Sequence, residues 1–176
     1  MVEILGGDYT FRCFARSSLL DDDTCELMKR LGVVEVGIGI ESGSTDILKK
    51  NMKGTTREHN LRAVENLHKN GIRAKAFLIV GLPGETVETI LETADWIEEA
   101  KPDDVDFSVL QPMPGSQIFK DPIKWGIAFN YNGNPGWYKG TPGEYSGVAT
   151  HDLSAEEIVA WRDLLEDEYK PKELLR

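Results

Sequence analysis

The sequence is poor in cysteine, with Cys13 and Cys25 as its only two. They lie twelve positions apart and belong to no C-x-x-C pair, so they match neither a metal-ligand spacing nor a disulfide framework. A chain this poor in cysteine is typical of a reducing compartment, and we expect it in the cytoplasm.

Long apolar runs and an excess of basic residues are also absent. No apolar run approaches the length of a membrane span, and the first seven residues lack the basic and apolar regions of a signal peptide. The 20 basic and 30 acidic residues give a formal net charge of −10, which argues against binding to a nucleic-acid backbone. Apart from a few local basic contacts, we expect neither a nucleic-acid partner nor a membrane partner for this segment.

Four runs rich in β-branched residues alternate with helical patterns along the chain. The expected strands cover residues 10–17, 33–41, 72–81 and 105–111. The expected helices cover residues 22–31, 56–70 and 86–100, with a short helix from Ser44 and a last one opened by a capping box at residues 154–157. This order predicts an α/β fold with parallel strands and right-handed crossovers.

Two of these strands end in glycine-rich turns that open helices. The first turn follows from Gly37-Ile-Gly-Ile-Glu-Ser-Gly-Ser44, and the second from Phe77-Leu-Ile-Val-Gly-Leu-Pro-Gly-Glu-Thr86. Units of this kind place their chemistry at the carboxyl edge of a parallel sheet, so we expect a site at that edge.

The two faces of the expected strand 33–41 differ in character. One face is apolar and suits packing against helices; it is formed by Val34, Val36, Ile38 and Ile40. The other face presents Gly37, Gly39 and Glu41, which is nearly bare backbone ending in a carboxylate. Such a surface favours a ligand lying against the strand, and the alternative is that the glycines only relieve crowding or mark a bulge.

Polar groups just after these strands are the candidate ligand contacts. The Glu41 carboxylate can hold an amine or a hydroxyl, and the backbone N–H groups of residues 42–44 can cradle an anion, although Ser44 also suits a helix N-cap. In residues 81–86 the backbone can approach a ligand closely, while Glu85 and Glu88 suit the dipole of the following helix.

Two further segments are open to more than one interpretation. The prolines of Gln111-Pro-Met-Pro-Gly-Ser116 fix backbone carbonyls, either to recognise an adenine edge or to form a rigid turn. Arg16 points the same way as Arg12 and Phe14. If that direction is inward, Arg16 needs a carboxylate such as Glu41 or a ligand; if it is outward, Arg16 is a surface charge.

Residues 121–150 are rich in glycine and aromatic side chains. A loop this long in a compact domain is typical of a functional or partly disordered segment. Its aromatic residues suit a substrate lid, or packing against another part of a larger protein, and both interpretations stay open.

Several motifs in order resemble the radical S-adenosylmethionine superfamily, most closely its methylthiotransferase, Elongator-like and cobalamin-dependent branches. Besides the two glycine-rich turns, these motifs are Lys50-Asn-Met-Lys-Gly-Thr-Thr56 and Leu110-Gln-Pro-Met-Pro-Gly-Ser116. The likeness covers residues 8–130, roughly three quarters of the chain.

The resemblance implies a partial TIM-like (βα)6 barrel. Residues 1–120 would form its last four βα units, and residues 121–176 a loop and a C-terminal helix. It also implies an iron–sulfur oxidoreductase or transferase. In such enzymes a C-x3-C-x2-C loop holds a [4Fe–4S] cluster that reduces S-adenosylmethionine, and the resulting 5′-deoxyadenosyl radical abstracts a substrate hydrogen.

By the same resemblance, seven residues face the bound cofactor: Arg16, Glu41, Ser42, Ile79, Gly81, Gln111 and Met113. The end of the strand at Glu41 would hold the polar ribose or methionine portion. The ends of the next two strands would line the adenine, the last of them through its backbone.

The sequence departs from the family pattern because it has no three-cysteine loop, and two isolated thiolates cannot hold a four-iron cluster through three protein ligands. We therefore expect a fragment of a longer enzyme that is inactive alone. S-adenosylmethionine and the cluster would bind in the full-length protein, with none bound tightly here, and a cobalamin-binding domain is plausible upstream.

Two alternatives remain open: a natural relative without a cluster, and a non-catalytic binding or scaffold domain on a degenerate barrel. The substrate is unknown. Because four parallel strands leave two open edges and an uncovered inner face, we also expect self-association, or shielding of that face by residues 121–150.

Overall fold

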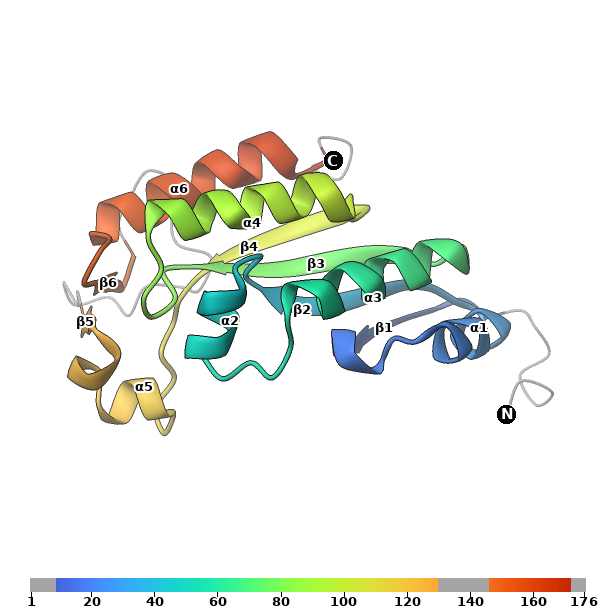
Figure 1. The fold of residues 1–176 in the computed structure, drawn as a ribbon, viewed down its shortest axis with the longest axis horizontal. Coiled ribbons are helices and arrows are strands. Elements are labelled where there is room, and N and C mark those ends of the chain that lie inside the picture. Colours follow the sequence, from blue (N-terminus) through green and yellow to red (C-terminus); the bar gives the residue numbers. More distant parts are fainter. Residues whose placement is uncertain (1–8, 130–145, 172–176) are drawn as a thin grey trace.

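The computed structural model describes residues 9–129 and 146–171, and its centre is a four-stranded parallel sheet (Figure 1). The strands follow one another in space as they do in sequence: β1 (Phe11–Ala15), β2 (Val33–Glu41), β3 (Arg73–Val80) and β4 (Asp104–Val109). Each neighbouring pair is parallel, which confirms the expected α/β fold.

Helices connect and follow the strands. They are η1 (Ser17–Leu19), α1 (Asp22–Arg30), α2 (Thr45–Lys50), α3 (Arg57–Lys69), α4 (Val87–Ala100), α5 (Gln117–Lys120), η2 (Ile123–Trp125) and α6 (Ala155–Tyr169). Side chains of Asp21, Thr56 and Thr86 cap α1, α3 and α4. The capping box between Ser154 and Glu157 at the start of α6 is confirmed.

The main core lies between the sheet and the helices. In Figure 1, α3, α4 and α6 lie side by side along the sheet, and α3 and α6 contact its strands directly. On β2 the buried side chains are those of Val33, Val36, Ile38 and Ile40, and on β3 those of Ala74, Ala76, Leu78 and Val80. The expected helix-facing rows are therefore confirmed, with one exception.

The exception is Val34, which is exposed. The pairing of β1 with β2 shifts its register here, because Phe11 pairs with Val33 whereas Arg12 pairs with Glu35. Val34 is thus the extra residue of a bulge, and bulges turn side chains away from the regular alternation. Sequence alternation alone assigns it to the buried row and is wrong at this position.

The opposite face of the sheet is open. Phe14 is 82% exposed there, and Phe77 beside it is half-buried. Charged residues of this face form ion pairs across strands: Glu35 lies 3.5 Å from Arg12 and 3.8 Å from Arg73, and Lys75 lies 2.7 Å from Asp104. Within the described residues, this face thus carries an exposed aromatic ring and charged side chains.

Part of the aromatic segment 121–150 is described. The strands β5 (Ile127–Phe129) and β6 (Val148–Thr150) pair antiparallel, and Trp125 and Phe129 pack against the core. The other aromatic residues of the segment, from Tyr131 to Tyr145, lie outside the described residues, so the lid interpretation stays a prediction. No helix in the described part of the chain has the length and apolar character needed to span a membrane.

Candidate functional site at the carboxyl edge of the sheet

Glu41 ends β2 in an unusual backbone conformation. The pairing of β2 with β3 skips one residue between Gly39 and Glu41, and Glu41 has a φ of 67°. This left-handed region costs an L-residue about 1–2 kcal/mol. Its carboxylate folds back over Gly39, where an added Cβ would lie 2.8 Å from Glu41 Oε1.

The partner of Glu41 is Lys53, which sequence reasoning missed. Lys53 Nζ donates to Glu41 Oε1 at 2.5 Å, and each side chain is only about a quarter exposed. An added Cβ on Gly39 would also lie 3.1 Å from Lys53 Nζ. The ion pair thus spans the glycine and covers the barest part of the strand.

Backbone geometry places Lys53 at this edge. Met52 has a φ of 53°, its N–H donates to Lys49 O, and the Lys53 N–H donates to Leu48 O. This is a Schellman ending of α2, here with methionine at the position that glycine usually occupies. It delivers the Lys53 side chain next to the end of β2.

Arg16 completes what we call the Glu41–Lys53–Arg16 cluster. It follows β1, and its Nη2 donates to Lys53 O at 3.1 Å. Arg16 is exposed, and Glu41, the protein partner expected for an inward Arg16, is paired with Lys53 instead. The cluster nevertheless joins three separate segments at one edge, as the fold predicts.

The inner face of β2 is less bare than the sequence predicts. At Gly37 an added Cβ would lie 2.6 Å from Phe77 Cε2 and 2.8 Å from Phe14 Cδ1. The two rings, with centroids 5.7 Å apart, fill the space from the neighbouring strands. At Gly37 the crowding interpretation is therefore correct, and at Gly39 the side chains over the backbone are those of the Glu41–Lys53 ion pair.

The turn after Glu41 is committed to internal hydrogen bonds. Ser42 N–H donates to Ile40 O, Gly43 N–H to Thr93 Oγ1 and Ser44 N–H to Ser42 Oγ. Because all three amides are used, the expected anion cradle is wrong. Ser42 is fully buried, and its Oγ lies 3.2 Å from Thr93 Oγ1, so its side chain ties β2 to α4.

Ser44 also differs from expectation. It occupies the N-cap position of α2, but its side chain makes no capping hydrogen bond, and its buried Oγ has no hydrogen-bond partner. The preceding Gly43 packs so closely on α4 that an added Cβ would lie 2.6 Å from Trp96 Cβ. Tight packing of the turn therefore replaces the predicted cap.

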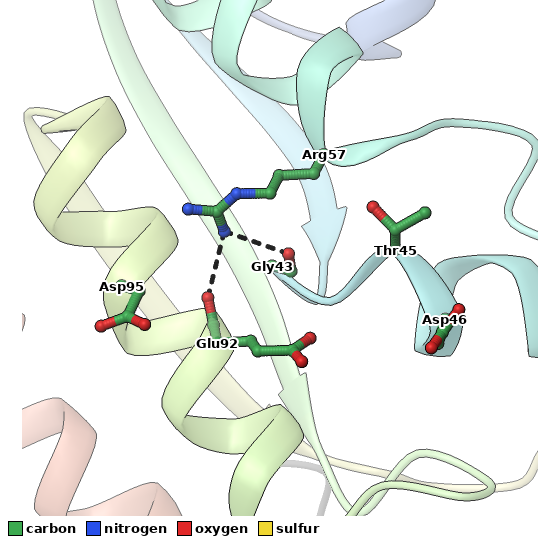
Figure 2. Close-up of a pocket in the computed structure, with 6 residues that line it drawn as sticks. All are labelled: Gly43, Thr45, Asp46, Arg57, Glu92 and Asp95. Carbon is green, nitrogen blue, oxygen red and sulfur yellow. Dashed lines mark hydrogen bonds between the residues drawn. The ribbon is translucent and has the colours of Figure 1, made fainter.

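A pocket of about 320 Å³ lies beside this turn, among α2, α3 and α4 (Figure 2). Arg57 reaches across it and donates to Gly43 O at 3.2 Å and Glu92 O at 3.1 Å. The guanidinium also pairs with Glu99 at 2.7 Å. The carboxylates of Asp46 and Asp95 line the same pocket, so its charge does not suit an anionic ligand.

The turn after β3 is organised by a buried carboxyl group. Glu85 is 2% exposed, and its Oε2 accepts the Gly81 N–H at 2.5 Å. Burial raises the pKa of Glu85 to about 8, although the N–H groups of Gly81 and Leu82 oppose this shift. The dipole of α4 alone does not explain the burial of Glu85. The exposed Glu88 fits that role, because the hydrogen bond from Thr86 lowers its pKa at the start of α4.

The last predicted contacts are divided between two sides. Ile79 lies on the open face, but Gly81, with a φ of 90°, is buried against α6, where an added Cβ would lie 3.0 Å from Ile158. The expected inner-face position of Gly81 is therefore wrong, because the positive φ turns the chain away. After β4, Gln111 has a buried Oε1 without a hydrogen-bond partner, and Met113 is exposed.

The described residues do not fit an iron–sulfur cluster. They contain no group of three or more His, Cys, Asp or Glu residues able to hold a metal ion. Cys13 is half-buried and Cys25 buried, and burial raises the pKa of both thiols, that of Cys25 to about 11. Raised thiol pKa values disfavour the thiolates that such a cluster requires.

Comparisons of the sequence with known proteins find a family model and similar proteins. The family model for the Radical SAM superfamily matches residues 2–97. A candidate methylthiotransferase of Methanocaldococcus jannaschii is 38% identical over 103 residues, covering 58% of this chain and 23% of that protein. The anaerobic magnesium-protoporphyrin IX monomethyl ester cyclase of Rubrivivax gelatinosus is 35% identical over 103 residues, covering 58% and 19%.

Solved structures show the same fold. The radical S-adenosylmethionine methyltransferase TsrM from Kitasatospora setae, with cobalamin and a [4Fe-4S] cluster bound, matches with a TM-score of 0.61 at 22% identity, over 71% of this chain and 27% of that chain. The N-terminally truncated Elp3 of Methanocaldococcus infernus matches with a TM-score of 0.60 at 21% identity, over 65% and 28%. The chain spans about a fifth to a quarter of its curated relatives.

Proposed function

The chain belongs to the radical S-adenosylmethionine superfamily, and from that premise we propose that it supplies the carboxyl-edge part of an S-adenosylmethionine site in a longer radical enzyme. The observation that carries the proposal is the Glu41–Lys53–Arg16 cluster, which lies at the end of the sheet and within the matched residues. In the complete enzyme an iron–sulfur cluster would supply the electron that cleaves the cofactor.

The proposed contacts fall into two groups. Glu41, Arg16 and Ile79 are available on the open face or its edge, and the Gln111 Oε1 atom is a buried acceptor at the end of the neighbouring strand. A carboxylate suits the cofactor's ammonium or ribose hydroxyls, and Ile79 suits the adenine. Met113, two residues after Gln111, is proposed as a further contact.

Ser42 and Gly81 support the site from behind in this proposal. The Ser42 side chain links the end of β2 to α4. Gly81 packs against Ile158 of α6, and its N–H donates to Glu85. Both would act by fixing the backbone next to a contact residue.

The chain alone is proposed to be inactive, because its described residues hold no cluster ligands. Its relatives include named methyltransferases and methylthiolating enzymes, which supports a transferase reaction in the parent protein. The cobalamin bound in TsrM supports a cobalamin-binding domain in the parent protein, outside this segment. The location in the cytoplasm and the partners stay predictions.

Titration of the chain with S-adenosyl-L-methionine, followed by backbone amide NMR, tests the site. We expect shifts at residues 39–42, 79–82 and 110–113, and weaker binding in Glu41→Gln. Glu35→Gln is the matched control, since Glu35 lies on the same strand but pairs with Arg12 and Arg73. Shifts confined to the Arg57 pocket, or no shifts at all, would contradict the proposal.

A second candidate is a non-catalytic binding or scaffold domain, and the lack of cluster ligands among the described residues favours it. Anaerobic reconstitution with iron and sulfide should give no stoichiometric cluster, as judged by visible absorbance and iron content. A stable cluster would contradict inactivity. A C-x3-C-x2-C segment encoded upstream in the same reading frame would exclude the second candidate.

A further inference from the structure

We propose that Asn51 is a positioning residue, which fixes the turn after β3 to the end of α2 and so holds the two glycine-rich turns in one geometry. The inference rests on the proposed function, because it concerns how the two halves of that site are kept in place relative to each other. Asn51 acts through the backbone of the turn and does not itself contact the ligand.

The first support is a hydrogen bond between the two loops. Asn51 Nδ2 donates to Pro83 O at 3.2 Å and to Ile47 O at 2.9 Å, and both bonds are partly buried. Ile47 belongs to α2 itself, whereas Pro83 lies 32 positions further along the chain, in the turn after β3. The amide group of one side chain thus joins two loops of the carboxyl edge.

The second support is that α2 ends without help from this side chain. Three backbone hydrogen bonds already close the helix, because the N–H groups of residues 51, 52 and 53 donate to the carbonyls of Ile47, Lys49 and Leu48. Backbone bonds of this kind satisfy the last carbonyls of many helices. Helix capping therefore does not explain the bond from Asn51 to Pro83.

The third support is the chemistry of the side chain. Asn51 Oδ1 is buried and has no hydrogen-bond partner, so the hydrogen bonds of this side chain come from its nitrogen. Both partners of the nitrogen are carbonyl oxygens, which accept hydrogen bonds and repel a carboxylate. The position thus requires a donor, which an aspartate of nearly the same shape does not supply.

The fourth support is a second contact between the same two loops. Lys50 precedes Asn51, and its side chain lies across Gly84, where an added Cβ would lie 2.6 Å from Lys50 Cδ and Cε. Figure 1 shows α2 beside the turn between β3 and α4. Two successive residues at the end of α2 therefore contact two successive residues of the turn.

The fifth support is that each loop is well fixed in itself. In α2, Ile47 and Leu48 are at most 2% exposed. In the turn, the Gly81 N–H donates to Glu85 Oε2 and the Glu85 N–H donates to Leu82 O. Loss of the Asn51 amide should therefore loosen the turn relative to α2 without unfolding either of them.

The test uses the whole chain and three variants. Asn51→Ala removes the amide group, and Asn51→Asp keeps its shape but supplies no donor. Asn66→Ala is the matched control, because Asn66 is also half-buried and its Nδ2 donates to a backbone carbonyl outside both turns, that of Leu20, at 2.9 Å.

The ligand-free measurement is amide hydrogen exchange by NMR. In both Asn51 variants, exchange at Gly81 and Glu85 should accelerate by about fivefold to tenfold, which is the effect expected from the loss of one hydrogen bond. Asn66→Ala should leave exchange at these two residues unchanged.

Titration with S-adenosyl-L-methionine, followed by NMR, supplies the second measurement. The Asn51 variants should bind the probe about fivefold to tenfold more weakly, again the effect of one hydrogen bond. Shifts at residues 79–82 should shrink in these variants, while shifts at residues 39–42 persist. Asn66→Ala should change the affinity by less than about twofold, because its site is independent of the two turns.

The outcomes separate this inference from the proposed function. If the wild type does not bind S-adenosyl-L-methionine, the proposed function is overturned, and this role with it. If the wild type binds and the Asn51 variants bind equally well, or if exchange at Gly81 and Glu85 stays as in the wild type, the positioning role alone is overturned. Equal effects of Asn51→Ala and Asn66→Ala also overturn it, because they reflect a general loss of stability.

Discussion

Single residues with left-handed backbone conformations shape the carboxyl edge. Glu41 ends β2 at a bulge, and Met52 ends α2 in a Schellman motif, where a non-glycine residue is uncommon. Each stores strain that glycine would not, and each determines where a charged side chain of the cluster lies. The free-energy cost of this backbone strain can be measured by substitution at Met52, because the Met52 side chain is exposed.

Met52→Gly should raise the free energy of unfolding by about 0.5–1 kcal/mol, because the relief of left-handed strain exceeds the entropy that glycine adds to the unfolded chain. Urea denaturation measures the change. Lys101→Gly is the matched control, since Lys101 caps the end of α4 with a φ of 50° far along the sequence from the cluster. A gain at Lys101 together with a loss at Met52 would show that the Met52 side chain stabilises the loop.

The residue scale also shows where prediction from sequence stops. Glu41 is identifiable because it ends an alternating strand, and a strand end has a known place in a parallel fold. Lys53 lies twelve positions later in a loop without periodicity, and only its three-dimensional turn brings it to Glu41. The signal that could have found it is Gly54, since a glycine after a short helix marks a turn that redirects the preceding residue.

At the scale of elements, prediction succeeds where information is local. The capping box of Ser154 and Glu157 depends on residues within a few positions, and it is confirmed. The predictions for Gly37 and Gly81 fail because the side chains around these glycines come from distant segments. Rings on neighbouring strands surround Gly37, and Ile158 of α6 lies against Gly81. A glycine in a strand indicates that another group lies close to the backbone there, but the sequence does not tell whether that group is a ligand or another part of the protein.

Glu85, in the turn between β3 and α4, should make the stability of the fold depend on pH. Its pKa is raised from 4.5 to about 8 in the folded protein, so the folded state binds more protons than the unfolded state between these values. The contribution of Glu85 to stability is therefore fully present below the unfolded pKa and is lost as the pH rises through the folded one. The loss should approach about 1.4 kcal/mol per pH unit.

Denaturation at several pH values between roughly 5 and 8 measures this slope. Glu85→Gln keeps an oxygen to accept the Gly81 N–H but cannot ionise, so its profile should be flatter than that of the wild type over this interval. Glu88→Gln, at the same helix start but exposed and with a lowered pKa, should leave the slope unchanged. Parallel profiles for wild type and Glu85→Gln would show that Glu85 is already ionised throughout.

At the scale of the whole molecule, the two faces of the sheet are unequal. Helices bury one face, while the other exposes Phe14 and part of Phe77 among ion pairs that are already satisfied within the chain. An exposed aromatic pair flanked by neutralised charges gains from being covered. We therefore expect copies of this chain to associate through the open face.

Sedimentation equilibrium over a range of concentrations tests this expectation. The wild type should show reversible association, and Phe14→Arg should weaken it by at least about tenfold, because an aromatic side chain at the centre of an interface carries much of its binding energy. Ile123→Arg is the control, since Ile123 is equally exposed but follows α5, away from the strands. A wild type that stays monomeric at every concentration would mean that the ion pairs keep the face soluble without a partner. Equal weakening of association by both variants would mean that the contact lies elsewhere.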